Sequence, residues 1–97
     1  TMVTGKRLGH PVRSLRTNYT REIARAEYSM NVTDEELEEM GVGALRLAAV
    51  EGDEKRGCFL AGQIAAMVKK EQPAAEIIRE IFEETEIVLN GAGKWVK

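Results

Sequence analysis

GCFLAGQIAAMVKK, residues 57 to 70, is the stretch from which the fold of this chain is best approached. Eleven consecutive residues, Cys58 to Val68, carry no charge, and Gln63 is the only strongly polar side chain among them. Apolar residues would surround a helix over 60–70, and such a helix is normally buried on all sides. A chain of 97 residues has little material with which to bury it. We therefore expect the chain to work as part of something larger.

The composition is that of an ordinary soluble protein. Apolar residues make up 43% of the chain and charged residues 31%, and the formal net charge is −2. The length allows one domain at most. Cys58 is the only cysteine and cannot form an internal disulfide, so a reducing, cytoplasmic location is expected. The apolar run around Gln63 is shorter than the roughly 20 residues that span a bilayer, which predicts no membrane partner.

The first sixteen residues are predicted to form one short strand and a loop. Met2-Val3-Thr4 favours a strand, and no later segment has the pattern of a partner strand. A partner in another chain, or in a sheet upstream, is therefore expected. Residues 5–16 are predicted to form a loop. Within it, Arg13 and Arg16 either clamp an anionic group or, as we favour, form surface salt bridges.

Start signals and glycines divide the middle of the chain into three predicted helices. Thr17 or Asn18 can cap the first helix. Thr33 and Glu36 form the spacing of a capping box at the start of the second. Glycines in the segment 41–43 disfavour helix and separate the second from the third. The three helices are predicted over 18–30, 34–40 and 43–51. Their inner faces carry Tyr19, Ile23, Ala26, Met30, Leu37, Met40, Ala44 and Ala48.

Two more helices complete the predicted fold. The apolar helix over 60–70 is followed by an amphipathic helix over 73–89, which Pro73 starts. Trp95 is expected to pack back on the rest of the chain. The predicted fold class is mainly α, with four to five helices after one short strand that lacks a partner.

Charge is unevenly distributed along the chain. Residues 1–32 carry six basic and two acidic side chains, whereas residues 33–97 carry eight basic and fourteen acidic ones. A basic arm on an acidic protein is one pattern of nucleic-acid binding. The arm has no aromatic residue before Tyr19 on which a base could stack. We therefore favour docking of the arm on acidic surface of its own protein, and we predict no nucleic-acid partner.

The sequence patterns that mark catalytic and metal sites are absent. One His and one Cys cannot form a zinc site, and there is no phosphate-binding loop, dinucleotide fingerprint or serine nucleophile elbow. His10 has no acid placed in sequence to orient it, so a solvated loop histidine is favoured. The apolar neighbours of Cys58 favour a buried structural thiol. We predict no catalytic residue and no metal ligand in this chain.

Gln63 is the candidate for a binding role. An amide with two donor hydrogens and an acceptor oxygen, set among apolar residues, needs partners. It either bonds a backbone group across a packed interface or faces a ligand at the start of its helix. In the second case Ala61 and Gly62 would present free backbone N–H groups beside it. The sequence leaves both interpretations open.

Three stretches of the chain are familiar when taken together. They are Val3-Thr4 followed by Gly9-His10-Pro11-Val12-Arg13-Ser14, then Glu39 to Arg46 running into Glu51-Gly52-Asp53, and then Gly57 to Val68 with Ala61-Gly62-Gln63-Ile64-Ala65. Their order and spacing resemble the C-terminal part of the FMN-dependent enoyl-acyl-carrier-protein reductase II family. The related nitronate monooxygenases (2-nitropropane dioxygenases) share the pattern more loosely. The resemblance covers residues 1–89.

The resemblance implies that the chain is a fragment of an α/β TIM-barrel flavoprotein. Residues 1–16 would then be the last barrel strand and a basic loop, and residues 17–97 a helical cap segment. The upstream barrel of the same protein is the implied partner, and a homo-oligomer is also expected. Gly62 and Gln63 would return to the flavin and substrate side and contact the cofactor.

The resemblance also implies redox chemistry. In the reductases, which serve fatty acid biosynthesis, NADH or NADPH reduces FMN, and the flavin passes a hydride to an enoyl thioester of acyl-carrier protein. In the oxygenases, the flavin oxidises a nitronate with O₂. The family's phosphate-binding loops and catalytic His lie upstream of this region, so the isolated chain is expected to bind no cofactor and to be inactive. The alternative is a self-standing helical interaction or oligomerisation module without catalysis.

Overall fold

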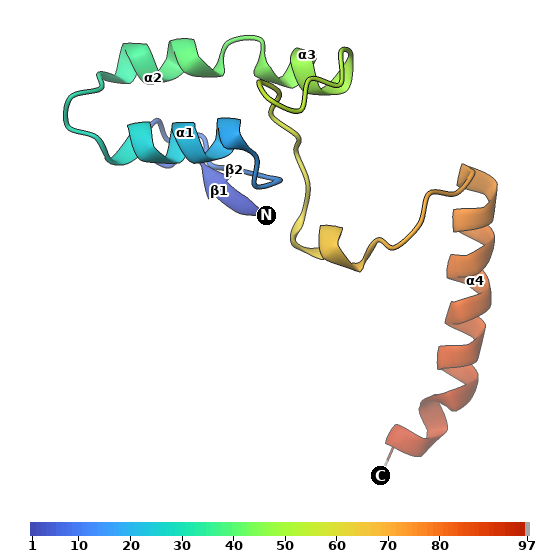
Figure 1. Cartoon of the computed structure of the whole chain (residues 1–97). Coiled ribbons are helices and arrows are strands. Elements are labelled where there is room, and N and C mark those ends of the chain that lie inside the picture. Colours follow the sequence, from blue (N-terminus) through green and yellow to red (C-terminus); the bar gives the residue numbers. More distant parts are fainter. Residues whose placement is uncertain (97) are drawn as a thin grey trace.

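The computed structural model describes residues 1–96. Two strands are followed by four α-helices and two short 3-10 helices. The elements are β1 (Met2–Thr4), β2 (Val12–Ser14), α1 (Asn18–Tyr28), α2 (Asp34–Gly41), α3 (Ala44–Ala49), η1 (Gln63–Met67), α4 (Ala74–Gly91) and η2 (Ala92–Trp95). Figure 1 shows β1, β2 and helices α1 to α3 gathered at one end, with α4 standing apart from them. We refer to residues 1–61 as the body.

The strand β1 has a partner within the chain, contrary to the sequence-based prediction. It pairs antiparallel with β2, so that Met2 lies opposite Ser14 and Thr4 opposite Val12. The segment 5–16 is therefore a turn followed by a strand. Gly5, with φ of +82°, allows the turn, because a side chain there would clash with the carbonyl of His10. Strands of three residues leave too little alternation for a sequence pattern to reveal β2.

The three predicted helices of the body are confirmed, with small shifts of their ends. The capping box is formed as expected: Glu36 N–H donates to Thr33 Oγ1 at 3.2 Å, and Thr33 N–H donates to Glu36 Oε2 at 2.8 Å. Gly43, with φ of +75°, separates α2 from α3. Its left-handed conformation is one that glycine adopts without strain, which explains the break.

The core of the body is small. Ile23 and Ala26 of α1 pack with Leu37 of α2, and the partly buried side chains around them are Leu8, Tyr19 and Val32. Met30 is fully exposed and Met40 is 39% exposed, so their predicted inward positions are wrong. Since α1 ends at Tyr28, Met30 lies in the following turn rather than on the helix face.

The helix predicted over 60–70 does not form. Residues 58–61 instead run extended beside β2, with an isolated antiparallel bridge between Ser14 and Leu60. Only Gln63–Met67 turns into a 3-10 helix, and none of its residues is buried. An apolar helix gains stability by burial on all sides, and the described residues offer it no such cover.

The last helix, α4, projects away from the body (Figure 1). It spans Ala74–Gly91, close to the predicted 73–89, and none of its residues is buried. The radius of gyration is 19.0 Å, whereas a compact chain of this length has about 13 Å. Trp95 is 83% exposed, so the prediction that it packs back on the chain is wrong. A search of the described helices for one long and apolar enough to cross a membrane found none.

Candidate functional site

The segment that carries the predicted binding residues is anchored to the body by backbone hydrogen bonds. Cys58 N–H donates to the carbonyl of Ala44 at 2.9 Å, at the start of α3. Leu15 N–H donates to the carbonyl of Phe59 at 2.9 Å, and Ala61 N–H donates to the carbonyl of Arg13 at 3.2 Å. Hydrogen bonds to α3 and to the segment around β2 therefore fix the path of the chain into Gly62 and Gln63. No sequence pattern indicates these partners.

Gly57 sets the close approach of this segment to α3. A Cβ atom at Gly57 would lie 2.5 Å from the carbonyl oxygen of Asp53 and 2.9 Å from the backbone N and Cα of Ala48. All three are backbone atoms, and their displacement would cost free energy. Gly57 N–H also donates to that same carbonyl of Asp53 at 2.8 Å. The turn from α3 back to β2 therefore requires glycine at this position.

The structure places Gly62 and Gln63 together at the surface. Gly62 precedes η1, Gln63 is its first residue, and both are exposed. The Gln63 side chain forms no hydrogen bond within residues 1–96, so the structure shows neither of the two partners considered for it. The expected free N–H group of Ala61 is not available, because it donates to the carbonyl of Arg13. A neutral amide at the surface can bind a polar edge of a ligand, but it supplies no base, acid or nucleophile.

A hollow of about 270 Å³ opens between the hairpin and the helices of the body. Its wall is mostly apolar and includes Tyr19 and Cys58. Burial raises the pKa of the Tyr19 hydroxyl, and the nearby Cys58 raises it further. Burial also raises the pKa of the Cys58 thiol, more than the hydroxyl of Ser14 lowers it. Both groups are therefore protonated at neutral pH. The hollow can take apolar atoms, and the acidic residues in its wall are Glu27 and Glu38.

Cys58 is a buried thiol, as the sequence indicated. The basic residues Lys55 and Arg56 do not lower its pKa, which burial raises instead. Ser14 is fully buried beside it, and the sequence did not predict this burial. Its burial follows from the pairing of β2 with both β1 and Leu60, and no local pattern reveals that pairing.

Arg13 and Arg16, which were considered for anion binding, form hydrogen bonds with Thr1 instead. The guanidinium of Arg13 donates to Thr1 Oγ1 at 3.1 Å, and Arg16 Nε donates to the Thr1 carbonyl at 3.1 Å. The predicted surface salt bridges of these two arginines do not occur within residues 1–96. His10 is exposed, as expected for a solvated loop histidine. The described residues contain no cluster of His, Cys, Asp or Glu that could hold a metal ion.

Comparison with known proteins gives one consistent similarity. No family model and no curated protein matches the chain. Among solved structures, FabK from Thermotoga maritima is 40% identical over 99% of this chain, with a TM-score of 0.89. An M276A mutant of the same FabK is 36% identical, also over 99% of this chain, with a TM-score of 0.77. FabK is an enoyl-acyl-carrier-protein reductase II, so these findings support the family that the sequence resembles.

The chain spans only part of the proteins that it resembles. It covers 30% of the FabK chain and 27% of the mutant chain. The similarity includes α4, because it extends over 99% of the residues. An identity of 40% means that the two chains are similar in sequence as well as in fold.

Proposed function

We propose that this chain acts as the mainly helical C-terminal part of a FabK-like, FMN-dependent enoyl-acyl-carrier-protein reductase. The observation that carries the proposal is the similarity to Thermotoga maritima FabK over 99% of the chain. Because the chain covers 30% of that protein, the remainder would include the TIM-type barrel on which the chain packs. In this arrangement residues 1–16, which form the β1–β2 hairpin, contribute the last barrel strand, and residues 17–97 cover the barrel mouth.

The exposed apolar surface of the chain fits a role as a covering segment. Many large apolar side chains in the second half of the chain are more than half exposed, among them Leu60, Ile64, Met67 and Val68. Exposed apolar surface of this extent is typical of an interface. An interface with a barrel of the same protein would bury these side chains without a second binding partner.

The residues around Gly62 fit one edge of a flavin ring, but not its phosphate. A Cβ atom at Gly62 would meet no atom within 4 Å, so the backbone there is open to a ligand. Leu60 and Ile64 on either side are 55% and 65% exposed and can contact a flat ring. Gly62 and Gln63 carry no charge, so the phosphate of FMN has to be held by other parts of the protein.

The chain's own residues would bind and orient rather than react. When bound, FMN supplies the transfer of a hydride from NADH or NADPH to an enoyl thioester of acyl-carrier protein. Gln63 would hydrogen-bond a polar edge of the flavin or the substrate through its amide, while Gly62 leaves room for a close approach. Leu60 and Ile64 would exclude water from that side of the site. None of these four residues moves a proton.

A chimera tests this proposal. The part of Thermotoga maritima FabK that matches this chain is replaced by residues 1–97, and flavin absorbance and NADH oxidation with an enoyl thioester are measured. A yellow, active chimera is expected. Gln63→Ala should weaken FMN or substrate binding, whereas Asn90→Ala on exposed α4 is the matched control. A chimera that folds, by circular dichroism and melting temperature, but binds no FMN would contradict the proposal.

Two other functions differ from this proposal in their expected behaviour. In a nitronate monooxygenase the same chain would cover a barrel that consumes O₂ with a nitronate, and a chimera assay with both substrates separates the two activities. The second alternative is an oligomerisation module without catalysis. The unpartnered apolar face of α4 favours this alternative. In that case the chain associates with itself and never contributes to flavin binding.

A further inference from the structure

Thr20 is fully buried, although its side chain is polar. It is the third residue of α1 and belongs to the capping box of that helix. Glu36 holds the same position in the capping box of α2, and it is exposed. Capping a helix therefore does not by itself require burial. A buried hydroxyl has to form its hydrogen bonds within the fold, and those of Thr20 reach beyond α1.

The hydroxyl of Thr20 joins the start of α1 to the end of β2. Its oxygen accepts a hydrogen bond from Thr17 N–H at 2.8 Å. Two carbonyls, those of Leu15 and Thr17, each lie 3.0 Å from the same oxygen and compete for its hydrogen. The Thr17 carbonyl already accepts from Arg21 N–H within the helix, at 3.2 Å. The Leu15 carbonyl, which follows β2 directly, therefore gains more from the Thr20 hydroxyl.

The backbone of Leu15 passes this constraint on to the segment 58–61. Leu15 N–H donates to the carbonyl of Phe59 at 2.9 Å, and Ala61 N–H donates to the carbonyl of Arg13 at 3.2 Å. Thr20 thus holds the carbonyl of Leu15, while Phe59 is bonded to its amide. Because a peptide unit is planar and stiff, displacement of one side of Leu15 displaces the other. Residues 13–15 therefore connect the buried hydroxyl to the segment 58–61.

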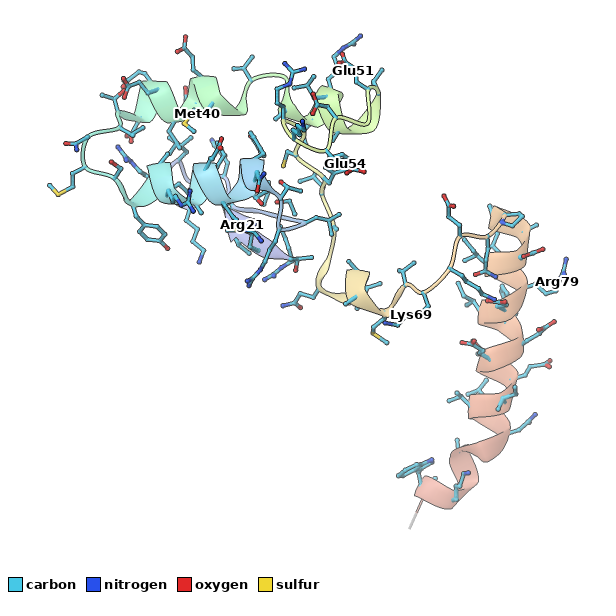
Figure 2. All side chains as sticks on the ribbon, viewed as in Figure 1. Arg21, Met40, Glu51, Glu54, Lys69 and Arg79 are labelled. Atoms are coloured by element: carbon cyan, nitrogen blue, oxygen red, sulfur yellow. The ribbon has the colours of Figure 1, made fainter. Side chains whose placement is uncertain are left out.

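The position of Gln63 depends on where this segment ends. Ala61 is the last residue before α4 whose backbone is hydrogen-bonded to another part of the body, within the described chain. Gln63 follows two residues later, in η1, none of whose residues is buried. Figure 2 shows Arg21, the residue after Thr20, on α1, and Lys69 on the linker that continues from η1. The body therefore controls the start of η1 through the hydrogen bonds of residues 58–61.

We propose that Thr20 is a positioning residue for Gln63. Its hydroxyl fixes Leu15 and with it the segment 58–61, which holds Gln63 where its amide meets the edge of the flavin. The proposal rests on the proposed function, in which Gln63 contacts that site. Thr20 itself touches neither flavin nor substrate, because it is buried inside the body. Small displacements of a contacting group weaken its contribution strongly, so a hydroxyl at this distance can control it.

Amide hydrogen exchange of the 97-residue chain tests the structural step without any flavin. Thr20→Val removes the hydroxyl and keeps the shape of the side chain. It should speed exchange of the Leu15 and Ala61 amides at least about tenfold and leave the Leu37 amide of α2 unchanged. Thr20→Ser keeps the hydroxyl and should stay within about twofold of the unmodified chain. Thr20→Ala, with the same expectation, replaces Thr20→Val if circular dichroism shows that the valine variant does not fold.

Thr33→Val is the matched control, because it removes the hydroxyl of the other capping box. The helix α2, on which Figure 2 shows Met40, forms no hydrogen bond with residues 58–61 in the described chain. Leu37 N–H donates to the Thr33 carbonyl at 3.1 Å. Thr33→Val should therefore speed exchange at Leu37 and not at Ala61. Equal acceleration at both amides in Thr20→Val would mean that Thr20 stabilises only the fold as a whole, and would overturn the proposal.

FMN binding to the chimera with Thermotoga maritima FabK tests the functional step. Thr20→Val should raise the dissociation constant of FMN at least about tenfold, whereas Thr20→Ser and Thr33→Val should leave it within about twofold. With Gln63→Ala already present, Thr20→Val should add no more than about twofold, because Thr20 acts through Gln63. The non-additivity separates positioning from a general loss of stability.

The outcomes distinguish this proposal from the proposed function. If the chimera binds FMN and Thr20→Val leaves the dissociation constant unchanged, Thr20 does not position Gln63 and the proposed function stands. A full effect of Thr20→Val in the Gln63→Ala background has the same meaning. If the chimera with residues 1–97 folds but binds no FMN, the proposed function fails and this proposal fails with it.

Discussion

Arg7 Nε donates to Asp34 Oδ1 at 2.7 Å and so joins the turn of the hairpin to the first residue of α2. The same guanidinium donates to the carbonyl of Val32 at 2.6 Å and to the carbonyl of Ser29 at 3.1 Å. One side chain therefore satisfies backbone acceptors in the loop between α1 and α2 and pairs with the helix that follows. It holds together three segments that share only a small apolar core.

Arg7→Ala should lower the free energy of unfolding by about 1–2 kcal/mol. Hydrogen bonds to charged groups contribute more than neutral ones, but the partly exposed ion pair with Asp34 contributes little by itself. Urea unfolding followed by circular dichroism measures the change. Lys6→Ala is the matched control, since Lys6 is an exposed basic neighbour and makes no ion pair in the described chain. Equal stability of the two variants would show that Arg7 does not organise the loop.

Gly57→Ala should destabilise the body by about 1–3 kcal/mol, because the added methyl group overlaps backbone atoms of Asp53 and Ala48. The urea midpoint is the measurement. Gly93→Ala is the control, because a Cβ atom at Gly93 meets no atom within 4 Å. An unchanged midpoint for Gly57→Ala would mean that the turn after α3 adapts to a side chain.

Asp53 should make stability depend on pH. The backbone N–H of Arg56, and then its guanidinium, hold the pKa of the Asp53 carboxyl below its usual value of 3.8. A lowered pKa contributes stability that is present above the unfolded value and is lost as the pH falls through the folded value. Unfolding should therefore become easier below about pH 4. Asp53→Asn should flatten this part of the profile, and Glu54→Gln next to it should leave the profile as it is.

Cys58 should react slowly with thiol reagents at neutral pH. Its thiol is buried and its pKa is raised, so the thiolate that reacts is scarce and poorly accessible. The rate of iodoacetamide labelling should increase strongly in denaturing guanidinium. Fast labelling of the folded chain at neutral pH would contradict the burial of this thiol.

Features that depend on neighbouring residues could be predicted from the sequence. The Thr33–Glu36 capping box, the break before α3 and the amphipathic helix after Pro73 all appear where the pattern places them. Gly52, shortly after α3, has φ of +61°, a left-handed conformation that glycine adopts without strain. Each of these follows from hydrogen bonds or backbone conformations that span only a few residues.

Features that depend on distant residues could not be predicted in this way. β2 exists because β1 pairs with it, and residues 58–61 are extended because Arg13 and Leu15 exchange backbone hydrogen bonds with them. Arg13 and Arg16 bond to Thr1, which lies 12 and 15 residues away in sequence, just before the neighbouring strand. Neither the composition nor the hydrophobic periodicity of these segments specifies which residues they pair with.

The stretch Gly57–Lys70 shows which features the sequence determines and which the tertiary structure determines. The sequence by itself indicated that this stretch is unusually apolar, and it predicted another surface that covers it. The tertiary structure decided its form: Gly57 approaches Ala48, Phe59 and Ala61 join β2, and only Gln63–Met67 turns into a short helix. The physical reason is that hydrophobicity is a property of residues, whereas an extended segment and a helix compete for backbone hydrogen bonds. The partner that is available in space decides that competition.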